Sequence, residues 1–594
     1  MKVATTIPHV LHENGRACPD APAYYVKDNG VWQPTRWGRH LAEVRQAARA
    51  LIALGVEPGG RVAILGFNRP EWVVFDLAAM LVGAAPAGIY TTSSAAEIQH
   101  ILAHTEASVL LVEGEEQGAK LRQVGGAPSR LRAVVRMRGA ADEDPEALGW
   151  DAFLAAGEAV GEDAVDRRLD GLRMDGLATL IYTSGTTGPP KGVMLSHANL
   201  SWMAESMRET LGLLPSDSLL SYLPLSHIAE QLTTIHGAIA ARYAVYFAET
   251  PAKVAENLRE VQPTLVFGVP RVWERFHEGV RARLQAATGA KAAIAAWAQR
   301  VGRRVAAAAN EQRQPGWPLA AQHRLASRLF FGRVKPALGL GRARFCACGA
   351  APIDREILEF FSGLDIVIYE IYGSSESSGP TTCNRPGVNR FGTVGQVWPG
   401  LEVRLAADGE ILVKGPGVFT GYYRDAAATA EALVDGWYHS GDLGELGGDG
   451  YLRIIGRKKE ILITTGGKNI TPDNIELALR KLELVAQAVA IGEGRNYVSA
   501  LLTLDQEAAA AFAREHGLAG EALDRHPLVL AEIEGRITRE VNPQLARVAQ
   551  VRKFRVLARD LTVEAGELTP TLKLKRRVID DHFAAEIESM YSGR

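Results

Sequence analysis

The run Leu177-Ala-Thr-Leu-Ile-Tyr-Thr-Ser-Gly-Thr-Thr-Gly-Pro-Pro-Lys-Gly192 joins an apolar strand to a loop of glycine and hydroxyl residues. Small residues in succession leave backbone N–H groups free to face an anion, and Lys191 adds a full positive charge. The run therefore predicts a phosphate-binding loop. It is not a Walker A loop, because Gly192 rather than Ser or Thr follows the lysine.

Apolar, β-rich runs alternate with helical patterns on both sides of this loop. Residues 62–65 predict a buried strand and residues 71–82 the helix after it, and further strands are expected at 108–112, 264–268 and 365–369. Strands that alternate with helices are typical of layered α/β folds with largely parallel sheets. From about residue 452 the chain becomes rich in Lys, Arg and Glu with a strand-helix-strand pattern. We therefore expect a large layered α/β domain over residues 1–456 and a small, mobile α+β domain over residues 457–594.

Composition excludes several classes of protein. The 594 residues are 47% apolar and 23% charged, as in ordinary globular chains. Basic and acidic residues number 66 and 68, so the net charge of −2 predicts no nucleic-acid partner. Four cysteines are too few for a disulfide framework, and their spacing fits no zinc site. The first residues form no continuous apolar segment, so we expect no secretory signal and a cytoplasmic protein.

One segment departs from this average. Residues 281–344 contain thirteen basic residues and a single acidic one, Glu311. The segment is rich in alanine and helical in pattern, and Trp297, Trp317, Phe330 and Phe331 offer apolar anchors. Such a stretch can lie on an anionic membrane surface, which would place the protein at the inner face of the membrane. A solvated pair of basic helices explains it equally well.

Further motifs add nucleotide chemistry. The small residues Gly349 to Ala351 would let a purine approach the backbone, and Tyr372 could stack on its other face. Glu376 supplies a hard oxygen ligand for Mg²⁺. Asp442 can accept hydrogen bonds from both ribose hydroxyls, and Arg457 can reinforce that contact.

Together these motifs resemble the adenylate-forming, AMP-binding synthetase superfamily and occur in its order. Residues 435–460 and 465–472 are similar to its long-chain fatty acyl-CoA synthetase branch. The resemblance implies a set of residues that bind ATP or AMP: Thr183, Ser184, Gly185, Thr186, Thr187, Gly188, Lys191, Gly349, Ala350, Ala351, Glu370, Ile371, Tyr372, Gly373, Ser374, Ser375, Asp442, Ile454, Arg457 and Lys575.

The resemblance also implies the other roles in the site. It assigns the acyl and CoA site to His227, Gly373, Gly466, Gly467 and Lys468, and the hinge between the domains to Lys459. It assigns Mg²⁺ binding to Glu376, with Thr183 as a second candidate ligand. It assigns the catalytic roles to Lys191, His227, Glu376 and Lys575.

The adenylation lysine lies in the run Leu568-Thr-Pro-Thr-Leu-Lys-Leu-Lys-Arg-Arg577. Aligned on Thr571, Lys575 takes its place. The pattern of the superfamily has a glycine just before this lysine, where the chain has Leu574, so Lys573 is a rival.

The activity implied is ATP-dependent conversion of a fatty acid to acyl-AMP, followed by transfer to CoA. Fatty acid, ATP and CoA are then the substrates, with Mg²⁺ as cofactor. Three alternatives remain open: an acyl-AMP ligase that loads a carrier protein, a CoA ligase for a medium-chain or aryl acid, and a non-catalytic membrane-associated acyl or nucleotide binder. The chain length of the acid and the oligomeric state, with a homodimer among the options, also stay open.

Overall fold

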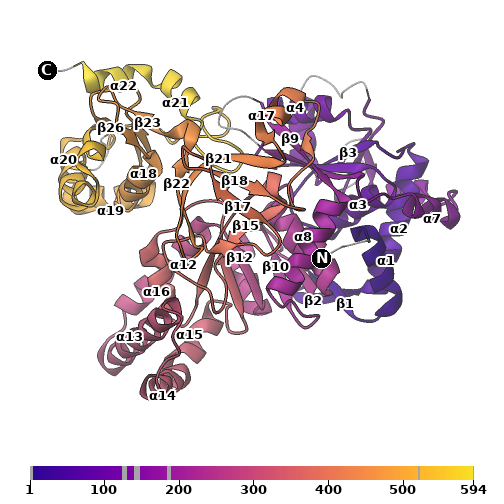
Figure 1. Ribbon diagram of the computed structural model, residues 1–594, viewed down its shortest axis with the longest axis horizontal. Coiled ribbons are helices and arrows are strands. Elements are labelled where there is room, and N and C mark those ends of the chain that lie inside the picture. The colour runs from indigo at the N-terminus through magenta and orange to yellow at the C-terminus, as the bar shows by residue number, and fades with distance from the viewer. Residues whose placement is uncertain (1–4, 124–129, 140–146, 184–188, 519–521, 593–594) are drawn as a thin grey trace.

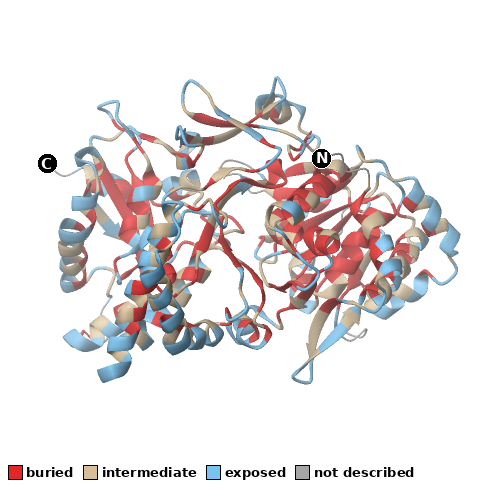
Figure 2. Cartoon of the chain, turned by 60° about the horizontal axis from the view of Figure 1, so that its bottom comes forward, coloured by how far each residue is buried: buried red, intermediate tan, exposed pale blue. Residues whose placement is uncertain are grey.

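The computed structural model describes residues 5–123, 130–139, 147–183, 189–518 and 522–592 (Figure 1). Over these residues the strands form two large sheets of nine and eight strands, a five-stranded sheet, and two small sheets near the C-terminus. Helices cover the large sheets, so the predicted α/β fold class is confirmed. Figure 2 shows the buried residues concentrated along the sheets and the exposed ones on the peripheral helices.

The eight-stranded sheet contains the phosphate-loop strand. Four parallel strands lie at its centre, β5 (Val109–Val112), β3 (Arg61–Leu65), β4 (Ala85–Ile89) and β8 (Leu177–Thr183). Apolar residues in unbroken runs explain why these strands are buried on both faces. β8 pairs antiparallel with β9 (Lys191–Ser196), so Thr183 and Lys191 face each other at the end of the hairpin where the phosphate loop connects the two strands.

The nine-stranded sheet brings three other motifs to one edge. Its central strands β10 (Ser218–Ser221), β12 (Leu265–Gly268), β13 (Phe345–Cys348) and β14 (Ile368–Ser374) are parallel. Their carboxyl ends therefore share an edge, which is where open α/β sheets bind ligands. Gly349 follows β13 at this edge, and Tyr372 lies within β14. The strand expected at 365–369 starts later, at Ile368.

The five-stranded sheet supplies the remaining nucleotide motif. Its strands β21 (Trp437–Leu446) and β22 (Leu452–Arg457) pair antiparallel with Asp442 opposite Arg457. Ile411 and Val413 of β18 (Glu410–Lys414) join the same hydrophobic core as the two large sheets. The sheet is thus packed onto the large body.

The C-terminal segment has hydrophobic cores of its own. Strands β25 (Val485–Ile491), β26 (Val498–Leu504) and β27 (Val551–Val556) form a sheet that packs on α18 (Pro472–Arg480) and α20 (Pro527–Arg536). A second cluster joins this sheet to the helices α21 (Arg576–His582) and α22 (Ala584–Tyr591). In Figure 1 these elements gather at one end of the molecule, in yellow. The boundary at residues 456 and 457 stays a prediction.

The basic segment forms a helical arm, here defined as α13 (Gly289–Asn310), α14 (Trp317–Ala326), a π-helical turn (Ser327–Phe331) and α15 (Gly332–Ala337). The arm projects from the lower side of the molecule in Figure 1. Its own small core includes Ala298, Val301 and Phe331. Within the described residues, no helix has the length and apolarity needed to cross a membrane.

Candidate functional site

A cavity of about 690 Å³ lies where the large sheets, the five-stranded sheet and the C-terminal segment meet. Many predicted site residues line it: Thr183, Lys191, His227, Gly349, Ala350, Ile371, Gly373, Ser374, Ser375, Glu376, Asp442, Arg457 and Lys459. The predicted residues Ser184, Gly185, Thr186, Thr187 and Gly188 lie outside the described residues. One cavity thus joins motifs that are almost 300 residues apart in sequence.

The ribose-binding chemistry is assembled around Asp442. Tyr372 donates its hydroxyl to Asp442 Oδ2 at 2.8 Å, and Arg457 Nε lies 3.1 Å from Oδ1. Burial and the neighbouring Asp442 raise the pKa of Tyr372, so the phenol stays protonated and keeps donating. Tyr372 does not line the cavity, and in this structure its hydroxyl orients the carboxylate of Asp442.

The backbone beside the predicted purine site is closely packed and locally strained. Ala350 has a φ of 71°, a left-handed conformation that side chains larger than glycine adopt rarely. A Cβ on Gly349 would lie 3.0 Å from the carbonyl oxygen of Ile371, so glycine lets β13 and β14 stay close there. Ala351, Glu370 and Ile454 lie outside the described lining of the cavity, and burial raises the pKa of Glu370 to about 8.

Glu376 and Lys191 face the phosphate end. Glu376 is 9% exposed, and its Oε1 accepts a hydrogen bond from the Tyr422 hydroxyl at 2.9 Å. Lys191 Nζ lies 5.1 Å from the centre of the same tyrosine ring. No cluster of three metal-ligating side chains occurs among the described residues. One carboxylate is what Mg²⁺ usually takes from a protein when phosphate oxygens supply further ligands, so the residues present fit that ion.

His227 lines the same cavity. It caps the short helix α9 (Ile228–Gln231), and its Nδ1 accepts a hydrogen bond from the Ala229 N–H at 3.1 Å. Burial, with a further contribution from Lys573, lowers the pKa of His227 to about 4. The imidazole is therefore neutral at physiological pH, and its proton is on Nε2.

Glu230 anchors the segment that carries His227, a role the sequence did not suggest. Its Oε1 accepts hydrogen bonds from Ser221 Oγ at 2.7 Å, Thr234 Oγ1 at 2.9 Å and Asn68 Nδ2 at 3.1 Å. Burial raises the pKa of Glu230 to about 7 despite these donors. Asn68 is 162 positions away from Glu230 in the sequence, and no local pattern reveals that contact.

Lys573, rather than Lys575, reaches the cavity. Residues 568–574 form a tight hairpin in which Leu568 bridges Leu574, and Thr569 N donates to the Lys573 carbonyl at 2.8 Å. Leu572 at its tip has a φ of 62°. Enclosure by the cavity and the nearby cation Arg457 lower the pKa of Lys573.

Lys575 points to a different element. Its Nζ lies 3.1 Å from Oε1 of Glu97, and the residue does not line the cavity. Lys575, placed in the site by alignment on Thr571, therefore does not line the cavity in this structure, whereas the rival Lys573 does. Lys573 lies inside the hairpin, directly after its tip residue Leu572, whereas Lys575 follows the hairpin as the N-cap residue of α21.

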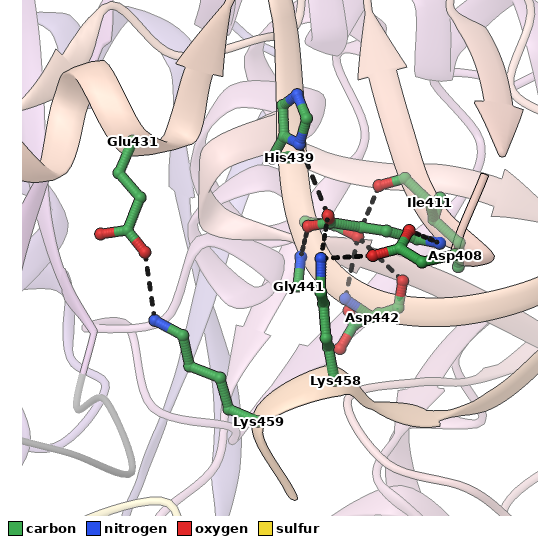
Figure 3. A network of polar contacts seen from close by, with 10 residues as sticks. Asp408, Ile411, Glu431, His439, Gly441, Asp442, Lys458 and Lys459 are labelled. Carbon is green, nitrogen blue, oxygen red and sulfur yellow. Dashed lines mark hydrogen bonds and ion pairs between the residues drawn. The ribbon is translucent and has the colours of Figure 1, made fainter. Parts of the chain in front are cut away.

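The predicted hinge residue lies in a polar network at the cavity rim (Figure 3). Lys459 follows β22 in a short 3₁₀ turn, and its Nζ contacts Glu431 Oε1 at 3.2 Å. The adjacent Lys458 binds Asp408 at 2.6 Å and Glu410 at 3.1 Å. Glu410 also accepts the N–H of Gly441, next to Asp442, at 2.9 Å. The turn and the ribose-binding strand are therefore tied together.

Gly466, Gly467 and Lys468 lie away from this cavity. They form an exposed turn between β23 (Leu462–Ile463) and β24 (Asn469–Ile470). The structure does not bring these three residues to the site that the other motifs build.

Comparisons with known proteins agree with these motifs. The sequence pattern of the AMP-binding enzyme family matches residues 11–423, and that of the AMP-binding enzyme C-terminal domain matches residues 459–594. The long-chain-fatty-acid–CoA ligase FadD15 of Mycobacterium bovis is 37% identical over 590 residues, covering 98% of this chain and 96% of the relative. Human long-chain-fatty-acid–CoA ligase ACSBG2 is 34% identical, covering 99% of this chain and 92% of the relative.

Solved structures share the fold at lower identity. A fatty acyl CoA synthetase of Mycobacterium tuberculosis is 20% identical with a TM-score of 0.62, and the match covers 98% of this chain and 99% of that one. An o-succinylbenzoate CoA synthetase of Bacillus subtilis, solved with its acyl-adenylate intermediate, is 21% identical with a TM-score of 0.68, covering 96% and 97%. The adenylate-forming fold is therefore confirmed.

Proposed function

Because the chain belongs to the AMP-binding enzyme family, we propose that it is an acid–thiol ligase that activates a long-chain fatty acid with ATP and transfers it to CoA. The observation that carries this is one cavity lined by both charged and apolar side chains. Lys191, Glu376 and Asp442 supply charges suited to a nucleotide. Apolar side chains suited to an acyl chain line the same cavity: Met207, Leu211, Leu213, Leu219, Leu232, Leu265 and Phe345.

In the first step, a carboxylate oxygen forms a bond to the α-phosphorus of ATP while the bond to the bridging oxygen breaks, and pyrophosphate leaves. No general base is needed, because the acid is already ionised, so catalysis consists of positioning and charge stabilisation. Asp442 would hold the ribose while Lys191 binds phosphate oxygens. Mg²⁺ bound at Glu376 would neutralise phosphate charge. We assign Lys573, which lines the cavity, to the charge at the attacked phosphate and the carboxylate.

His227 would border the carboxylate. A neutral imidazole with its proton on Nε2 can donate one hydrogen bond to a carboxylate or acyl oxygen without adding charge. Glu230, through Ser221 and Thr234, holds the backbone on which this histidine stands.

In the second step, the CoA sulfur forms a bond to the acyl carbon, the bond to the phosphate oxygen breaks with its electron pair, and AMP leaves. The thiol proton passes to solvent. We propose that the C-terminal domain rotates about Lys459 between the steps. The exposed turn at Gly466 to Lys468 would then approach the CoA channel, which accounts for its position outside the present cavity.

We also assign the helical arm to peripheral contact with the anionic inner face of a membrane, from the cytoplasm. Every residue of 281–344 is described, and of its thirteen lysines and arginines only Arg313, Lys335 and Arg344 form ion pairs, while His323 pairs with Asp365. Unpaired, exposed arginines therefore lie beside exposed apolar side chains, Trp317 at 83%, Leu325 at 49% and Leu329 at 43%. This combination fits a lipid surface better than a purely solvated helix pair.

The vesicle test replaces Arg300, Arg303 and Arg304 with Gln and measures binding to anionic vesicles. A matched control replaces the exposed basic residues of β27, Arg552, Lys553 and Arg555. Weaker binding in the first variant alone supports the contact. Equal binding by both variants and the parent chain would show that the helical arm is a solvated surface without membrane contact.

The test of the activity is pyrophosphate release from ATP across carboxylic acids of increasing length, with and without CoA, together with direct detection of acyl-CoA. Long-chain acids should give acyl-CoA, AMP and pyrophosphate. Acyl-AMP that accumulates whether or not CoA is present would instead indicate a ligase that loads a carrier protein. Pyrophosphate release with aryl or medium-chain acids alone would show that the substrate is not a long-chain fatty acid.

A further inference from the structure

Helix α4 (Ala95–Thr105) contacts three separate parts of the site. Glu97, His100 and His104 lie at positions i, i+3 and i+7, so they share one face of the helix. Glu97 pairs with Lys575 at 3.1 Å, and His100 Nε2 lies 3.2 Å from the carbonyl oxygen of Pro190, next to Lys191. His104 Nδ1 lies 2.8 Å from the hydroxyl of Tyr182 in β8. One rigid helix therefore connects the lysine hairpin to the phosphate strand and loop.

A second contact holds the other side of the hairpin. Thr92, in the loop before α4, donates its hydroxyl to the carbonyl oxygen of Pro570 at 2.8 Å. Pro570 lies before Lys573 in the sequence, and Lys575 lies after Lys573. The two contacts therefore flank the lysine that enters the cavity, and both are made to the large body.

The carboxylate of Glu97 is held in place before it meets the lysine. Its Oε2 accepts the N–H of Ser94 at 3.0 Å, and Glu97 N donates to Ser94 Oγ at 3.3 Å, which together form a capping box. Oε1 is left for Lys575. The side chains of Glu97 and Lys575 are only 12% and 18% exposed, so water screens this pair less than an open surface pair.

We propose that Glu97 and Lys575 are positioning residues for adenylation, which hold the hairpin against α4 so that Lys573 stays in the cavity with the phosphate loop. They touch no reacting atom and act through Lys573. Because the same pair must separate when the C-terminal domain rotates, it favours the first step over the second. This inference rests on the proposed function, and in particular on Lys573 as the adenylation lysine.

The experiment measures the two half-reactions separately. Adenylation is followed by pyrophosphate release, and thioester formation by acyl-CoA made from supplied acyl-adenylate. The variants are Glu97→Gln, which keeps the capping box, and Lys575→Met, which keeps the aliphatic stem. We expect each variant to slow adenylation roughly tenfold, because each loses one partly buried ion pair. Thioester formation should be unchanged or faster.

A charge exchange and a matched control sharpen the test. The double variant Glu97→Lys with Lys575→Glu should recover part of the adenylation lost in the single variants, because it restores the ion pair but not the capping box at Ser94. Glu588→Gln breaks an ion pair with Arg495 that lies wholly inside the C-terminal segment, and it should change neither step. Thermal unfolding of every variant checks that the fold is kept.

Several outcomes would overturn the inference. Unchanged adenylation in Glu97→Gln and Lys575→Met would do so, and so would an equal loss in both half-reactions with an unchanged fold. If the single variants unfold, failure of the charge exchange to restore adenylation would also count against it. These results differ from failure of the proposed function, in which the parent chain itself releases no pyrophosphate with any fatty acid.

Discussion

Replacing Lys573 with Ala should abolish most of the adenylation activity and spare the thioester step. The side chain lines the cavity, and its pKa is influenced by Arg457, Asp442, Glu460 and Glu376, so these charged groups surround the amine. No other lysine of residues 568–577 lines the cavity. The second half-reaction needs no charge at the attacked phosphate, since pyrophosphate has already left.

The size of the effect follows from the charge that is removed. A unit charge about 4 Å from a phosphate oxygen contributes about 4 kcal/mol at an effective dielectric constant of about 20. Removal of one preorganised donor from a developing anion costs about 2.7–4 kcal/mol in other enzymes, which is about 10²–10³ in rate. Lys575→Ala removes only a partly exposed ion pair, for which we expect about tenfold. The two lysines should therefore differ by at least about tenfold.

The assay is pyrophosphate release under saturating ATP and fatty acid, with single-turnover thioester formation from supplied acyl-adenylate as the internal control. Lys573→Ala should be slow in the first and within about threefold of the parent in the second. A larger adenylation defect in Lys575→Ala than in Lys573→Ala would refute the reasoning. Equal loss of both half-reactions in Lys573→Ala would show that the residue serves the fold.

Four further results are expected. Because the pKa of Lys573 lies below its usual 10.5, adenylation should decline on the alkaline side before that pH, and Lys573→Arg should move the decline upward in a pH–rate profile. Asp442→Asn should raise the KM for ATP about 10- to 100-fold, because the acceptor for the ribose and for Tyr372 is weakened. Burial raises the pKa of Glu230 from 4.5 to about 7, so the folded state holds a proton that the unfolded chain releases, and stability from this group falls as pH rises from 4.5 to 7. Urea denaturation of Glu230→Gln should show a smaller loss across that range. Lys459→Pro should impair thioester formation before adenylation, as the two half-reaction assays would reveal.

Local patterns predicted much of the fold and the cavity. Continuous apolar runs predicted the strands near residues 62 and 109, and β3 and β5 lie at these positions. Residue chemistry alone suggested Asp442 with Arg457, and the strand register brings them together. Such features depend on a few neighbouring residues, so a sequence can reveal them.

Contacts across long distances in the chain escaped prediction. Glu97 meets Lys575 from 478 positions away, and nothing in the local sequence at either residue marks the pair. The hydrogen bond from Tyr372 to Asp442 likewise joins residues 70 positions apart. The loop from Ser184 to Gly188, which prompted the nucleotide interpretation, lies outside the described residues.

The choice between the two lysines depends on the backbone of one residue. The pattern of the superfamily places glycine immediately before the adenylation lysine, and an alignment that ignored its conformation gave Lys575. In the structure Leu572, immediately before Lys573, has the left-handed φ of 62° that glycine adopts readily. Leucine in this conformation costs about 1–2 kcal/mol. Its side chain is 54% exposed, so packing does not require leucine there. Leu574 instead bridges Leu568 across the hairpin, which leaves no turn before Lys575. A residue in a conformation typical of glycine therefore precedes Lys573 and not Lys575, which supports our assignment of Lys573 as the adenylation lysine.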